Sequence, residues 1–260
     1  MGMGRILLLA GLPAGLGAST VALALADALC GLERSVVLVA SLAGLGNPPL
    51  SPLPAQALGS AWLLPQESGP DFLPLELCDE RELPGLLPLL AREADFILVD
   101  RFTGLHVKGN PWYRAADEVV LLVDGRPGLD TRSLLLAGHV LRHWPGRPLH
   151  VLHTRMGGPF NWQTQAQRFL RRLERHHGLP ARDLGCLPEA AEIQRSHEEG
   201  RPFTRMYPNH PGSRQLRQTA RQLLRLADLG LPRSPVREPD WQRDPNTPRE
   251  VGLQRVEVRP

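Results

Sequence analysis

Near the start of the sequence, RILLLA at Arg5–Ala10 is followed directly by GLPAGLGAST at Gly11–Thr20. The first stretch is a continuous apolar run, typical of a strand buried on both faces of a parallel sheet. The second is a glycine-rich turn that leads into an Ala- and Leu-rich helical pattern over Ser19–Leu32. Another apolar run follows at Ser35–Ala40. The order strand, loop, helix, strand predicts a parallel sheet built with right-handed crossovers.

The same alternation continues to residue 227. Further strands are predicted at Asp95–Asp100, Glu118–Val123, Leu149–His153 and Asp183–Leu187, with a short one around Leu75–Cys78. Further helices are predicted at Glu82–Arg92, Leu129–His143, Asn161–His177, Ala190–Ser196 and Ser213–Ala227. Residues 42–75 are dense in Pro and Gly and are expected to form a loop. We therefore expect a doubly wound, mainly parallel α/β sheet flanked by helices in three layers, with ligands at the carboxyl ends of its strands.

Composition favours a single domain of ordinary globular type. With 260 residues, we expect one domain over residues 1–230 and a Pro- and Arg-rich disordered tail over residues 231–260. The formal net charge of +3 is scattered along the sequence, and Lys108 is the only lysine. The three cysteines match neither a disulfide framework nor a metal motif. No stretch approaches the roughly 20 apolar residues of a spanning helix, so we expect a cytoplasmic protein.

The glycine-rich turn lies where a phosphate-binding loop would lie, between a buried strand and a helix. In such loops glycines, here Gly11, Gly15 and Gly17, let backbone N–H groups face phosphate oxygens. Ala18, Ser19 and Thr20 open the helix, whose N-terminus favours anions. A Ser or Thr hydroxyl and a carboxylate at a nearby strand end hold Mg²⁺ in these sites, which indicates Ser19 and Asp100.

This order of elements resembles the MinD/ParA superfamily of P-loop proteins. That family's loop carries two lysines, which here fall on Pro13 and Ala18, and an aspartate that prepares the attacking water, where Ala40 and Ser41 stand. Within the superfamily the sequence is most similar to the flagellar-number regulator branch (FlhG/FleN). The likeness is carried by Ser41–Asn47, Asp95–Gly104, Ala116–Asp130 and Gly185–Ser196.

The resemblance implies a protein that binds ATP or ADP with Mg²⁺ weakly and hydrolyses ATP little or not at all. It places Thr154 and Pro188 near the nucleotide base. It further implies protein partners in a cell-envelope machine such as the polar flagellum, and a homodimer as the candidate assembly. The expected location is cytoplasmic, with peripheral association at the inner face of the membrane or the cell pole. No specific nucleic-acid partner is expected.

Three alternatives remain open at this point. The first is a cellulose-synthesis-associated MinD-like protein (BcsQ type). The second is a working ATP-dependent dimerising switch in which Arg101 or Lys108 replaces the missing cations, although a solvent-facing role is favoured for both side chains. The third is a DNA-binding partition protein using the arginine-rich helices. For those helices, at 168–175 and 213–227, packing on the sheet is favoured over binding to an anionic membrane. The segment 47–74 is a hypothetical partner surface.

Overall fold

The structure is a computed structural model. It describes residues 3–11, 17–46, 48, 50–51, 53–58, 61–79, 81–100, 110–126, 130–143, 148–156, 162–178 and 181–228. The predicted tail at 231–260 and the proposed boundary at 230 lie outside the described residues.

The core of the molecule is a seven-stranded sheet in which every neighbouring pair of strands is parallel. The strand order across it is β5-β2-β6-β1-β7-β8-β9. The strands are β1 (Arg5–Gly11), β2 (Val36–Ala40), β5 (Asp71–Pro74), β6 (Phe96–Asp100), β7 (Glu118–Asp124), β8 (Leu149–Met156) and β9 (Arg182–Pro188). The central strands are buried along almost their whole length, and their interiors are apolar, because helices cover both faces. The predicted fold class is confirmed.

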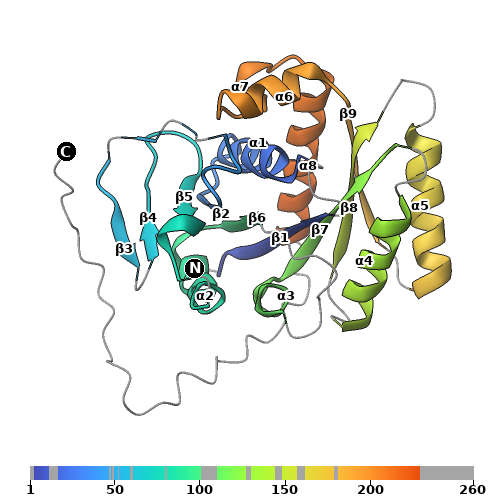
Figure 1. The fold of residues 1–260 in the computed structure, drawn as a ribbon, viewed down its shortest axis with the longest axis horizontal. Coiled ribbons are helices and arrows are strands. Elements are labelled where there is room, and N and C mark those ends of the chain that lie inside the picture. The colour runs from blue at the N-terminus through green and yellow to red at the C-terminus, as the bar shows by residue number, and fades with distance from the viewer. Residues whose placement is uncertain are drawn as a thin grey trace, which may run out of the picture.

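Helices form a layer on each side of this sheet (Figure 1). They are α1 (Ala18–Cys30), α2 (Leu83–Glu93), α3 (Pro111–Ala115), α4 (Asp130–His143), α5 (Trp162–His177), α6 (Ala191–Glu198), α7 (Phe203–Met206) and α8 (Pro211–Asp228). The apolar residues of α1, α7 and α8 form one buried cluster with one face of the sheet, and those of α2 to α5 form a second cluster with the other. These two cores hold the strand ends in fixed positions.

The strand order places a ligand site at the carboxyl end of β1. β1 pairs with β6 on one side and with β7 on the other, while the chain reaches β2 through α1. The sheet therefore grows in opposite directions from β1, and such a switch point leaves a crevice between the flanking connections. The phosphate-loop sequence lies directly at this point.

The loop expected over residues 42–75 was wrong in part. It contains an antiparallel hairpin, β3 (Gln56–Leu58) and β4 (Ala61–Leu63), and then the edge strand β5. β5 has only Phe72 and Leu73 between polar and proline neighbours, which is too short for a local pattern, and its pairing with β2 defines it. The strand expected around 75–78 is instead a 3₁₀ turn at Leu75–Leu77.

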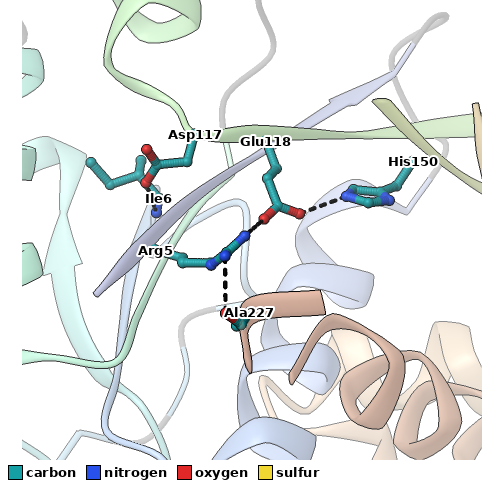
Figure 2. Close-up of polar contacts among 6 residues, drawn as sticks. All are labelled: Arg5, Ile6, Asp117, Glu118, His150 and Ala227. Carbon is teal, nitrogen blue, oxygen red and sulfur yellow. Dashed lines mark hydrogen bonds and ion pairs between the residues drawn. The ribbon is translucent and has the colours of Figure 1, made fainter. Parts of the chain in front are cut away.

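A buried charged cluster lies at the opposite edge of the sheet, where β1, β7 and β8 begin (Figure 2). Arg5 donates to Glu118, and Glu118 Oε2 lies 2.6 Å from His150 Nε2. Arg5 Nη2 also donates to the carbonyl of Ala227 near the end of α8, at 3.0 Å. Burial disfavours the carboxylate, but the hydrogen bond and charge of His150, together with Arg5, outweigh it and hold the pKa of Glu118 below its usual value.

Candidate functional site

A cleft of about 910 Å³ lies at the carboxyl edge of the sheet. It brings together the end of β1, the start of α1, and the ends of β6, β8 and β9. Among its lining residues are the sequence-predicted Gly11, Gly17, Ala18, Ser19, Thr20, Asp100, Thr154 and Pro188. Gly15, also predicted, lies outside the described residues. Residues from four distant parts of the chain thus meet in one cleft.

The start of α1 is suited to an anion. Gly17 is the N-cap residue with φ of 75°, a left-handed conformation that favours glycine. No side chain caps this helix end, and its first turn carries no acidic residue. The N–H groups of the first turn have no partners inside the helix, so they can bind phosphate oxygens, and the helix dipole supports them.

Ser19 and Asp100 lie next to each other at this helix end. The Ser19 hydroxyl hydrogen bonds to the Asp100 carboxylate. Burial raises the pKa of Asp100 above its usual value, and the hydrogen bond from Ser19 opposes part of this shift. A hydroxyl and a carboxylate beside a phosphate site are the oxygen ligands from which Mg²⁺ takes one or two, with phosphate and water completing its shell. The donor set therefore fits a Mg²⁺–nucleotide complex.

Two arginines that the sequence analysis did not single out also line the cleft, namely Arg126 and Arg155. Arg126 follows β7 and makes a bidentate contact with buried Asp124, through Nε to Oδ1 at 3.0 Å and Nη2 to Oδ2 at 2.6 Å. Its backbone N–H donates to the same Oδ1 at 2.9 Å. Burial opposes ionisation of Asp124, but the hydrogen bonds and charge of Arg126 hold the pKa of Asp124 below its usual value.

Arg155 has a φ of 54°, unusual for a non-glycine residue. Arg126 lies two residues beyond the end of β7 and Arg155 is the next-to-last residue of β8, so a position near a strand end was the available signal in the sequence. The described part of the cleft therefore carries its cationic side chains at the ends of β7 and β8. Arg101 and Lys108, the replacement cations considered from the sequence, lie outside the described residues.

Thr154 lines the cleft and carries a buried, unsatisfied hydroxyl. Its side chain is only 3% exposed, and its Oγ1 has no hydrogen-bond partner among the described residues. The Nδ1 atom of His197, another lining residue, is also buried and has no hydrogen-bond partner among the described residues. Buried polar atoms in native proteins are nearly always paired, so these two atoms are candidate partners for an ordered water or a polar ligand in the cleft.

His153, the neighbour of Thr154, does not belong to the cleft lining. Its ring packs edge-on against Phe169 of α5 at a centroid distance of 5.7 Å. Burial lowers the pKa of His153 to about 4, so the ring is neutral at physiological pH. Of this strand-end pair, only Thr154 can serve a ligand in the cleft.

Ser41, at the position of the missing water-preparing aspartate, also lines the cleft. Its hydroxyl donates to Glu76 Oε1 at 2.6 Å, and the Leu42 N–H donates to the other Glu76 oxygen at 3.2 Å. The acid that contacts this position is therefore Glu76 of the 3₁₀ turn, and both of its carboxylate oxygens accept these hydrogen bonds.

No helix among the described residues has the length and apolarity to cross a bilayer. The described His, Cys, Asp and Glu side chains include no cluster of three that could bind a metal ion.

No protein-family model matches the chain, and no curated protein matches its sequence. Solved structures do match the fold. The septum site-determining protein MinD from Pyrococcus horikoshii, complexed with Mg-ADP, gives a TM-score of 0.66 at 21% identity, over 87% of this chain and 98% of that one. The MinC:MinD cell division complex of Aquifex aeolicus gives 0.66 at 17% identity, over 85% and 96%. A ParA family ATPase from Chlorobium tepidum gives 0.60 at 17%, over 85% and 99%. The chain therefore has the MinD/ParA fold.

Proposed function

We propose that the chain is a MinD/ParA-like regulatory or scaffold protein that binds nucleotide with Mg²⁺ and turns it over little or not at all. The observation that carries this proposal is the cleft. It keeps the uncapped helix end, the Ser19–Asp100 pair and the unpaired Thr154 hydroxyl, while the loop sequence has Pro13 and Ala18 in place of lysines.

The retained groups serve binding, whereas the missing lysines contribute to both phosphate binding and chemistry in such loops. Backbone N–H groups and the helix dipole at α1 would hold phosphate, and Ser19 and Asp100 would hold Mg²⁺. Phosphoryl transfer needs cations on the transferred group, and each such group contributes several kcal/mol to the transition state. Without both lysines and the water-preparing acid, turnover is expected to be lost before binding is.

By resemblance to the flagellar-number regulators, the role of such a protein is to place or count a cell-envelope machine through protein contacts, with the polar flagellum as the leading machine. Cellulose synthesis is the alternative. The matched Aquifex aeolicus structure is a MinC:MinD complex, which supports a protein partner for this chain as well. A homodimer is part of the same proposal.

The experiment is phosphate release from Mg-ATP by the purified full chain, with Asp100→Ala as the matched background. The expected result is release at the level of that variant. Multiple turnovers that Asp100→Ala abolishes would establish the second candidate, an ATP-dependent dimerising switch. One observation favours that candidate, because Arg126 and Arg155 supply cations to the cleft. In that case light scattering would show ATP-dependent dimers.

A further inference from the structure

The outer helices α4 and α5 concentrate positive charge that is scattered in the sequence. Together they carry six arginines against Asp130 and Glu174. This excess of four is larger than the formal net charge of +3 of the whole chain. By the same count the rest of the chain has a formal charge of about −1, although α8 is also basic, with four arginines against Asp228.

These arginines share one exposed surface. β7, β8 and β9 are parallel, so the helices that connect them, α4 and α5, run side by side in the same direction at one end of the sheet (Figure 1). The arginines of α5 recur at helical spacing on the side away from the core. The basic face consists of exposed Arg132, Leu135 and Arg142 on α4 and exposed Arg168, Arg171, Arg172 and Arg175 on α5.

The two helices that carry this face pack against each other. A Cβ atom at Gly138 of α4 would lie 2.4 Å from His177 Cε1 of α5, so the absence of a side chain at Gly138 gives the His177 ring its place between the helices. The buried sides of both helices, including Ala137, Val140 and Phe169, belong to the core. The arginines therefore lie on the solvent side of both helices.

Leu135 lies within this array and is 53% exposed, the largest exposure among the large hydrophobic side chains that the structure describes. An exposed leucine between Arg132 and Arg142 on α4 adds little to the binding of a nucleic-acid backbone, which offers phosphate and sugar groups. It is also a smaller apolar centre than a specific protein interface needs. An anionic bilayer matches both features, because headgroups attract the arginines and the acyl boundary accepts leucine.

We propose that the basic face is a docking surface for an anionic lipid bilayer. Arginine stems would lie along the interface with their guanidinium groups on the headgroups, and Leu135 would enter the acyl boundary. This inference does not depend on nucleotide binding, because the basic face shares no residue with the lining of the cleft.

The test is co-sedimentation of the full chain with vesicles of phosphatidylcholine alone or mixed with phosphatidylglycerol. Binding only to the mixed vesicles is expected, with loss in high salt. Replacing Arg168, Arg171 and Arg175 by Gln should weaken binding by about 100-fold, since each arginine near such a surface contributes about 1 kcal/mol. Leu135→Ser should weaken it further.

Helix α8 supplies a matched control. Arg214, Arg221 and Arg225 are also exposed arginines on a long helix, so replacing them by Gln changes the net charge equally. The proposal expects this variant to bind mixed vesicles like the unmodified chain. It is overturned by absence of binding to mixed vesicles, by equal loss in both triple variants, or by α5-dependent binding to duplex DNA without binding to vesicles.

Discussion

Ala18 is the residue at which one missing lysine of the phosphate loop can be restored most directly. It is half-buried, lies in the cleft at the start of α1, and occupies the position at which the resemblance expects a lysine. We predict that Ala18→Lys strengthens ATP binding by roughly 10- to 100-fold, because a charge-assisted contact with phosphate contributes about 1.5–3 kcal/mol. Calorimetric titration measures this, with Ala18→Met as the uncharged control of similar length. Equal affinities for the two variants would contradict the assignment.

Thr154 tests whether the unpaired hydroxyl serves a ligand. We predict that Thr154→Val leaves the free energy of unfolding unchanged or raises it by up to about 1 kcal/mol, because an unsatisfied buried group is removed. The same variant should lose about 5-fold or more in nucleotide affinity. Thr204→Val is the matched control. Thr204 Oγ1 donates to Asp27 Oδ2 at 2.7 Å in α1, so this control should lower stability and leave nucleotide affinity unchanged.

His153 predicts a pH dependence of folding. Its pKa is about 4 in the folded protein against 6.5 for an unperturbed histidine, so below pH 6.5 the unfolded chain binds a proton that the folded chain does not. Stability should be full above pH 6.5 and fall by up to about 3 kcal/mol as the pH decreases toward 4. Urea unfolding at several pH values measures this slope. In His153→Leu the decrease over this interval should be smaller, and an unchanged slope would contradict the assignment.

At the scale of elements, the charged cluster links the start of three strands to the end of α8. We predict that Glu118→Gln lowers the free energy of unfolding by about 3 kcal/mol, because buried Arg5 loses its counter-charge. The pKa of Glu118 is held below the ordinary 4.5, so its contribution is full above pH 4.5 and is lost as the pH falls through the lower folded value. The variant should show less acid destabilisation there. Equal acid sensitivity of both proteins in urea unfolding would argue against the cluster.

Elements whose signal is local could be predicted from the sequence. The apolar runs of β1, β2, β6, β7 and β8 and the long helices were found because burial imposes their patterns over five or more residues. β5 and the β3–β4 hairpin were missed because they depend on pairing between segments rather than on composition. The short helices α3 and α7 were missed because four or five residues are too few to show a helical period.

The candidate site divides in the same way. Gly17, Ser19 and Asp100 could be assigned because Gly17 and Ser19 lie at the start of α1 and Asp100 ends β6, two elements with a strong local pattern. The Asp124–Arg126 pair, the left-handed Arg155 and the contact of Ser41 with Glu76 required the fold. The basic face likewise appears only in the fold, because α4 and α5 are separated by a strand in the sequence and lie side by side in the structure.

On the scale of the whole molecule, three regions lie apart from one another in the fold. The carboxyl edge of the sheet carries the cleft, the opposite edge carries the buried charged cluster, and the outer layer over β7 to β9 carries the basic face. Because these regions share no residues, their functions can be tested by separate variants.

The central claim is that the lysine-free cleft still holds a nucleotide. The most direct measurement is calorimetric titration of the full chain with ADP and ATP in the presence of Mg²⁺, beside Ser19→Ala and Thr154→Val. We predict saturable binding of at least one nucleotide, and we predict that this binding is weaker in both variants. Absence of saturable binding at millimolar nucleotide, or binding that neither variant alters, would contradict it.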